Sequence, residues 1–228
     1  MAGNDERKRQ KKLARKRKKS AQKKAQKAAS QPLLPKHPQE LAKFILDPKK
    51  MTTPKQIDDN VTAFCASINP DFEPVTLEIT PEDWCRQSCC NLNVAEIIKA
   101  DGGELLCGYK IWYHEPYYIE GERHAIHRSD DGVLRDPTFA ADGETKIVFV
   151  ADVPERSTKF DDNVDKKRSA TDPAVQSLVN TLNDHERRNP IRKLSDAQSW
   201  ATMQTYADWK AGKRQASVWV EGRRKNAR

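Results

Sequence analysis

Between residues 32 and 74 the hydrophobic positions recur at the spacing of amphipathic helices. A short helix is predicted over 39–47. A longer helix is predicted from Thr53-Pro54 onward, because threonine supplies an N-cap and proline suits the first helical position. We therefore expect a helical lead-in over 32–74, with Cys65 in the core. The apolar stripe of the longer helix consists of Ile57, Val61, Phe64, Cys65 and Ile68.

From residue 75 to residue 153 hydrophobic and polar positions alternate with the period of two that is typical of half-buried strands. One helix interrupts this pattern and closes at Asp101-Gly102-Gly103. Turn signals at Asp130-Asp131-Gly132 and Ala141-Asp142-Gly143 separate the later strands. A helix followed by an antiparallel β-meander predicts an α+β core. Strands are expected over 75–79, 105–113, 117–128, 133–138 and 146–150.

Residues 154–228 are predicted to form a helical C-terminal extension. An amphipathic helix begins after Asp172-Pro173 and ends at Pro190. Ser195 can cap a last helix, whose aromatic stripe is better explained by packing than by ligand binding. That stripe consists of Trp200, Met203, Tyr206 and Trp209.

The charge of the chain is concentrated at its N-terminus. The 228 residues carry a net charge of +8, but residues 1–30 alone hold 13 Lys and Arg against 2 acids, so the remainder is mildly acidic at −3. Residues 7–27 contain no aromatic side chain, and Leu13 is their one large aliphatic residue. We therefore predict a disordered basic tail over 1–31 that contacts nucleic acid or the ribosome through phosphates. The alternative is a solubilising tail or localisation signal without a defined partner.

No run of about 18 apolar residues exists, as a membrane-spanning helix requires, and the N-terminus lacks the apolar region of a secretory signal. The cysteines are odd in number and two are adjacent, which is a poor disulfide framework and fits a reducing compartment. These features predict a soluble cytoplasmic protein with no membrane association. The five cysteines are Cys65, Cys85, Cys89, Cys90 and Cys107.

Cys90 is the candidate nucleophile of a thiol site. A thiol becomes reactive when a helix N-terminus or a nearby imidazole lowers its pKa. If Ser88 caps a helix over 89–100, Cys90 falls in the first turn and gains the helix-terminal effect. If the helix begins at Thr80 instead, Cys90 lies mid-helix and gains nothing from the dipole. No Gly or Pro between 84 and 94 distinguishes the two starts.

The loop Asp130-Asp131-Gly132 decides which histidine meets Asp136. With a three-residue loop, Asp136 lies opposite Ile126 and is a diagonal neighbour of His124 on one face. With a two-residue turn the parity flips, and Asp136 shares a face with His127. In either register one histidine meets the carboxylate, which would fix the tautomer and orientation of a catalytic base.

Short motifs occur in order between residues 90 and 138. They are Cys90-x-x-Asn93-Val94, Gly102-Gly103, Gly108-Tyr109-Lys110-Ile111-Trp112, Glu122-x-His124-Ala125-Ile126, Asp131-Gly132-Val133-Leu134 and Asp136-Pro137-Thr138. This set, which covers about 50 residues, resembles an uncharacterised bacterial and phage family, some members of which are labelled SEC-C (zinc-chelation) proteins. The resemblance implies Cys90 rather than Cys89, and His124 rather than His127.

The sequence departs from the family pattern at three places. Tyr109 and Arg123 stand where the family has Trp and Phe, and Asp136-Pro137-Thr138 replaces Asp-x-Thr-Pro. The cysteine-rich zinc tail of the SEC-C motif is absent, so the zinc label does not carry over, and no cofactor is expected.

The order of cysteine, histidine and aspartate is also similar to papain-like and transglutaminase-like folds. This likeness implies acyl transfer, in which Cys90 attacks an amide or ester carbonyl, His124 takes and returns the proton, and Asp136 orients His124. The backbone N–H of Cys90 and the side chain of Asn93 are candidates for stabilising the oxyanion. Hydrolysis, deamidation and crosslinking differ in the acceptor of the acyl group.

Two other hypotheses stay open at this point. Cys85 and Cys89 are four residues apart, which is compatible with one helix face and a zinc site completed by a histidine such as His127. However, His124 and His127 would point to opposite faces of a strand. The other hypothesis is a non-catalytic protein on the same fold that associates with nucleic acid or the ribosome through its tail.

Overall fold

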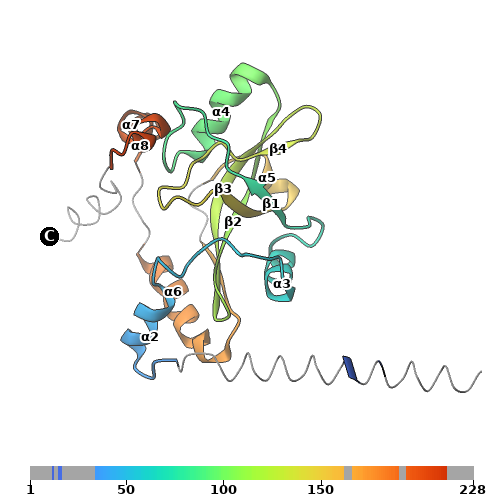
Figure 1. Cartoon of the computed structure of the whole chain (residues 1–228), viewed down its shortest axis with the longest axis vertical. Coiled ribbons are helices and arrows are strands. Elements are labelled where there is room, and N and C mark those ends of the chain that lie inside the picture. The colour runs from blue at the N-terminus through green and yellow to red at the C-terminus, as the bar shows by residue number, and fades with distance from the viewer. Residues whose placement is uncertain (1–11, 13–14, 17–33, 162–165, 190–193, 215–228) are drawn as a thin grey trace, which may run out of the picture. The chain divides into compact units, whose positions relative to one another are not determined.

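The computed structural model of the protein describes residues 12, 15–16, 34–161, 166–189 and 194–214. The chain divides into two compact units, Met1–Lys36 and His37–Arg228. The basic tail over 1–31 lies outside the described residues except for 12 and 15–16, which have helical backbone and are exposed. Its disorder and its contact with polyanions stay predictions. The helices and strands named below belong to the second unit (Figure 1).

An antiparallel sheet of six strands, counted over the described residues, forms the framework of the second unit (Figure 1). The strand order is β1-β5-β2-β3-β4, and β6 pairs with β3. The predicted α+β class is thereby confirmed. The strands are β1 (Val75–Glu78), β2 (Glu104–His114), β3 (Tyr118–Arg128), β4 (Leu134–Arg135), β5 (Lys146–Ala151) and β6 (Lys167–Ala170).

The strand order departs from a simple meander at β5. Strands β2, β3 and β4 follow one another as hairpins, but β5 returns across the sheet to pair with both β2 and β1. Five of the six residues of β5 are buried, and such a continuous apolar run favours a central position over an edge. Gly108 of β2 permits the close pairing, because a Cβ there would lie 2.1 Å from the Val150 carbonyl oxygen.

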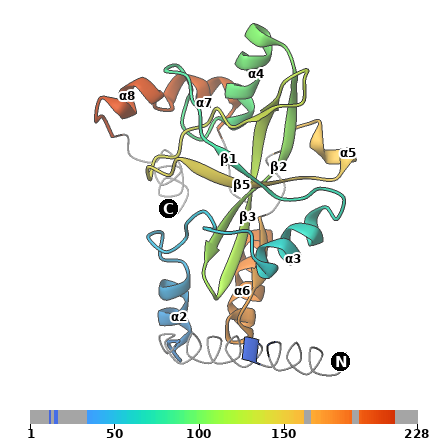
Figure 2. The ribbon, with the colours of Figure 1, turned by 45° about the vertical axis from the view of Figure 1, so that its right-hand side comes forward.

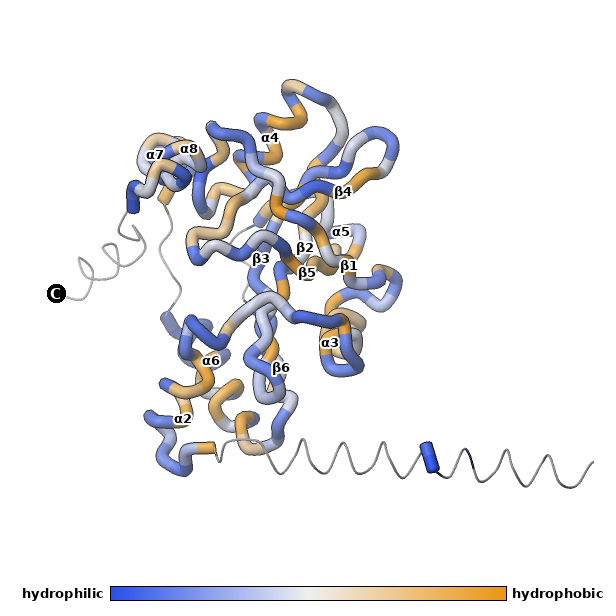
Figure 3. Tube along the Cα trace, in the orientation of Figure 1, coloured by the Kyte–Doolittle hydropathy of each residue, from blue (hydrophilic) through white to orange (hydrophobic). Residues whose placement is uncertain are grey.

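Seven α-helices and one 3₁₀-helix accompany the sheet in the described part of the chain (Figure 2). In α2 and α6 hydrophobic and hydrophilic positions alternate along the helix (Figure 3), as is typical of amphipathic helices. The helices are α2 (Pro38–Ile45), α3 (Asp59–Ile68), α4 (Cys90–Asp101), α5 (Pro154–Ser157), η1 (Pro173–Val175), α6 (Gln176–Arg188), α7 (Asp196–Thr202) and α8 (Tyr206–Lys210). None of the helices in the described ranges is long and apolar enough to span a bilayer.

Helix α3 packs its apolar stripe against the sheet. Cys65 is fully buried there, so its prediction as a core residue is confirmed. The prediction of Thr53 as the N-cap is wrong, because the Asp58 carboxylate accepts hydrogen bonds from the N–H groups of Asn60 and Val61 and starts the helix later. The Thr53 hydroxyl instead donates to the carbonyl of Lys146, tying the lead-in to β5.

The last predicted helix is divided in two. Ser195 caps α7 with a capping box completed by Gln198, as expected. The chain then becomes extended from Met203 to Thr205, and α8 begins after a second cap. The aromatic spacing by threes therefore does not reflect one continuous helix.

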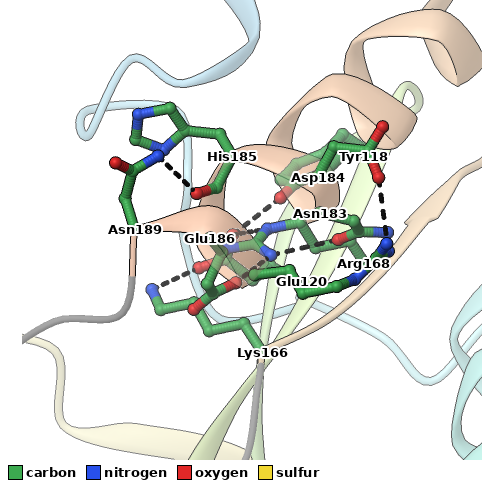
Figure 4. A network of polar contacts seen from close by, with 10 residues as sticks. Tyr118, Glu120, Lys166, Arg168, Asn183, Asp184, His185, Glu186 and Asn189 are labelled. Atoms are coloured by element: carbon green, nitrogen blue, oxygen red, sulfur yellow. Dashed lines mark hydrogen bonds and ion pairs between the residues drawn. The ribbon is translucent and has the colours of Figure 1, made fainter.

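A buried ion network fastens β6 and α6 to β3 (Figure 4). Glu120 on β3 accepts hydrogen bonds from the Tyr118 hydroxyl and from Lys166, both at 2.6 Å, and pairs with Arg168 on β6 at 3.2 Å. Arg168 also forms an ion pair with Glu186 of α6. Removal of one charged partner would leave another charge buried and uncompensated, which would destabilise the fold. We regard it as structural.

Candidate active site

Cys90 is the first residue of α4, and the start of that helix is now defined. The Thr80 N–H donates to the backbone carbonyl of Asp136 at 2.8 Å, and Ile79 forms a bridge with Asp136. The chain after Thr80 is thus held beside the sheet and does not begin a helix. Cys90 consequently lies in the first turn, where unpaired N–H groups favour negative charge.

The residue that introduces the helix differs from the prediction. The sequence leaves Ser88 and Thr80 open as N-caps, but Cys89 occupies that position and no side chain caps the helix. Ser88, just before it, has a φ of 56°, a left-handed conformation uncommon outside glycine.

His124 and Asp136 lie on neighbouring strands in the register that a three-residue loop predicts. The Ser129 N–H donates to the Val133 carbonyl at 3.0 Å, and His127 pairs with Arg135. This register brings His124 Nε2 to 3.0 Å from Asp136 Oδ2. The alternative pairing of Asp136 with His127 does not form.

Cys90 lies close enough to the imidazole of His124 to interact with it electrostatically. Burial disfavours the charged imidazolium, but the Asp136 carboxylate and Cys90 outweigh burial and raise the pKa of His124 to about 10. The three groups thus form one continuous chain from thiol to imidazole to carboxylate.

Asp136 is fully buried and held from two sides. Its Oδ1 accepts a hydrogen bond from the Thr138 N–H at 2.9 Å, while Oδ2 faces His124. Its backbone carbonyl is the acceptor for Thr80. A carboxylate constrained in this way can fix the orientation of the imidazole, as a nucleophile-base-orienter set requires.

The structure corrects the prediction that the Asn93 side chain stabilises an oxyanion. Its Oδ1 accepts from the Arg86 N–H at 2.8 Å, and its Nδ2 donates to the Arg86 carbonyl at 2.8 Å and to Thr138 Oγ1 at 3.1 Å. Both amide protons are therefore used. Asn93 is fully buried and joins the loop before Cys90 to the segment that follows Asp136, which is a positioning role.

The other cysteines lack the surroundings of Cys90. Cys89 is buried next to Cys90 in the chain, and burial raises the pKa of its thiol to about 12. Burial likewise raises the pKa of the Cys85 thiol to about 11. These thiols stay protonated near neutral pH, whereas Cys90 interacts with the charged imidazole of His124.

The alternative zinc set of Cys85, Cys89 and His127 is not assembled. Within the described ranges no group of three or more His, Cys, Asp or Glu side chains is placed to hold a metal ion. His127 Nε2 instead pairs with the Gly102 carbonyl at 2.9 Å, which ties the end of α4 to β3. A Cβ at Gly103 would lie 2.6 Å from the same nitrogen, so glycine is needed there.

The C-terminal helices reach the loop before Cys90, a contact that sequence reasoning missed. The Gln87 N–H donates to the Gln204 carbonyl at 3.0 Å, and the Tyr206 N–H donates to the Cys85 carbonyl at 2.8 Å. Arg86 forms a bridge with Thr205 between these bonds. Such backbone pairing depends on the extended break between α7 and α8, for which the periodic aromatic spacing gave no signal.

The same C-terminal segment touches the chain beyond Asp136. The rings of Tyr206 and Trp209 pack against Phe139, and Trp209 Nε1 donates to the Ala141 carbonyl. The segment 196–210 therefore contacts both the loop that precedes Cys90 and the chain that follows Asp136.

Comparison with known proteins assigns neither a family nor a function to the chain. No protein-family model matches the chain, and no curated protein or solved structure gives a significant match.

Proposed function

We propose that the protein is a thiol acyl-transfer enzyme in which Cys90 is the nucleophile, His124 the base and Asp136 the orienting carboxylate. The observation that carries this proposal is the placement of His124, whose Nε2 lies 3.0 Å from the Asp136 carboxylate and whose pKa is raised by both Asp136 and Cys90. Cys90 is also the first residue of α4.

The chemistry follows from these contacts. The charged imidazole and the N-terminus of α4 both favour the thiolate, which attacks the carbonyl carbon of an amide or ester. His124 then transfers its proton to the leaving group, and an acceptor resolves the acyl-enzyme. Because the side chain of Asn93 is occupied, the backbone N–H groups of the first turn of α4 are the donors proposed for the oxyanion.

The test is formation and turnover of an acyl-enzyme with a small activated ester such as p-nitrophenyl acetate. We expect a burst of p-nitrophenol and a transient acetyl group on Cys90, detected by peptide mass spectrometry. Cys90→Ala should abolish both, and His124→Ala should slow acylation by roughly 100-fold or more. Cys89→Ala is the matched control and should acylate as the native protein does. Acetylation that is spread over several cysteines would contradict the proposal.

The basic tail supports a separate proposal, contact with a polyanion through residues 7–27. The 13 basic residues within 1–30 carry the excess charge, and removal of 1–30 leaves a net charge of −3. Affinity for RNA of mixed sequence should fall steeply with salt in the full chain and be lost on deletion of 1–30. An unchanged affinity and salt slope after deletion would remove this proposal and leave the thiol site unaffected.

A further inference from the structure

Cys107 is a second thiol beside Cys90, and the mechanism above gives it no role. It lies on β2, pairs with Ala125 of β3 and is fully buried. Cys90, Cys107 and Ala125 form a small apolar cluster, bounded by Leu105 and Phe160. The thiol of the nucleophile helix and a thiol of the sheet therefore lie in the same buried cluster.

The two thiols differ in reactivity. Burial raises the pKa of Cys107 to about 12, and Arg123 nearby only partly offsets it while Cys90 adds to it. Cys107 therefore stays protonated near neutral pH and is a poor target for direct oxidation, since oxidation follows thiolate character. Cys90 contacts the charged His124 and retains a little exposure, at 7%. An oxidant thus reaches Cys90 first.

Cys89 is a poor partner for a disulfide with Cys90, although it is adjacent. Consecutive Cα atoms across a trans peptide are about 3.8 Å apart, which is below the range of about 4.4–6.8 Å that unstrained disulfides adopt. Cys107 shares a buried cluster with Cys90 and, because it is distant from Cys90 in sequence, is not subject to that restriction.

We propose that Cys90 and Cys107 form a reversible disulfide when hydrogen peroxide oxidises Cys90, which switches the thiol site off. The proposal rests on the proposed function, because it requires Cys90 to be the reactive thiol. The disulfide would also spare Cys90 from irreversible oxidation, as resolving cysteines do.

The steps balance in atoms and electrons. The Cys90 thiolate attacks one peroxide oxygen, the O–O bond breaks, and hydroxide leaves as the sulfur is oxidised to sulfenic acid. The Cys107 sulfur then attacks the Cys90 sulfur, forming the S–S bond and breaking the S–O bond. The departing hydroxide takes the Cys107 proton and leaves as water. A dithiol such as dithiothreitol reverses the bond by two exchanges and is itself oxidised to a disulfide.

The experiment uses the full-length protein with several equivalents of hydrogen peroxide, because oxidation of a thiol to sulfinic acid consumes two, followed by iodoacetamide labelling and non-reducing peptide mapping. In the native protein we expect loss of Cys90 labelling, a peptide pair linked through Cys90 and Cys107, and full recovery with dithiothreitol. In Cys107→Ala, Cys90 should be oxidised to sulfinic acid and lose its labelling, and the dithiol should restore less than a tenth of that labelling. Cys89→Ala, which removes an equally buried neighbouring thiol, should behave as the native protein.

The outcomes separate this inference from the proposed function. If Cys107→Ala recovers as fully as the native protein, or if no linked Cys90–Cys107 peptide appears in native protein, the disulfide proposal is overturned. Labelling of Cys90 before peroxide is added tests the nucleophile independently. A labelling rate that is the same in native protein and in His124→Ala would instead contradict the proposed function.

Discussion

His124 is the residue on which the site depends, because it interacts with both Asp136 and Cys90. Its Nε2 lies 3.0 Å from the buried Asp136 carboxylate, and both neighbours raise its pKa. Burial alone would lower the pKa of a histidine, so the raised value reflects the two acidic neighbours. Between about pH 6.5 and pH 10 the imidazole is therefore mostly charged in the folded state and mostly neutral in the unfolded state.

This linkage predicts a pH-dependent stability. The pKa of His124 rises from its ordinary value of 6.5 to about 10 on folding, so the stabilisation is complete below about 6.5 and is lost as pH rises through about 10. Asp136→Asn should lower the free energy of unfolding by about 3 kcal/mol at pH 6 and by clearly less at pH 10.5. Urea unfolding at both pH values measures the difference. An equal loss at both values would contradict the linkage.

Thr138 is expected to be a positioning residue. Its hydroxyl accepts from Asn93, and its backbone N–H donates to Asp136. Thr138→Val removes the first bond, and we expect Cys90 alkylation to slow several-fold and its pH profile to shift, while Thr138→Ser restores both. Thr171→Val is the matched control, because it removes a comparable hydroxyl bond to the Pro116 carbonyl away from the site. Equal labelling in the two valine variants would assign Thr138 a purely structural role.

At the scale of elements, the site joins the N-terminus of α4, the β3–β4 hairpin and the C-terminal segment 196–210. The hairpin and the closing glycines of α4 were predictable, because loop residues and alternation act locally. The pairing of the C-terminal segment with the loop at 85–87 was not, since it depends on backbone groups that any residue carries. The central position of β5 likewise depends on long-range burial.

Two alanines allow the role of the C-terminal segment to be measured. Ala207 is exposed at the second position of α8, and its N–H donates to the Asp83 carbonyl. Proline is tolerated in a first helical turn, so Ala207→Pro should remove only that bond, worth about 1 kcal/mol. We expect faster hydrogen exchange at 83–87 and slower Cys90 alkylation. Ala197→Pro, at the same position of α7, should change neither, and identical behaviour of the two variants would exclude a specific contribution from α8.

At the scale of the whole molecule, an α+β unit over His37–Arg228 carries the thiol site, and a strongly basic segment precedes it. The two are independent in their chemistry, because the site is buried and the charge excess lies within residues 1–30. Their combination in one chain suits the two proposals together, an acyl-transfer enzyme and a tail that brings it to a polyanion.

The most direct measurement is the rate at which iodoacetamide alkylates Cys90 at pH 7, in native protein and in His124→Ala. Site-resolved mass spectrometry distinguishes Cys90 from the four other cysteines of the chain. We predict that Cys90 reacts much faster than a free thiol of ordinary pKa, and that the advantage is lost in His124→Ala. A Cys90 that reacts no faster than a free thiol, or equally fast without His124, would contradict the assignment of a catalytic thiol.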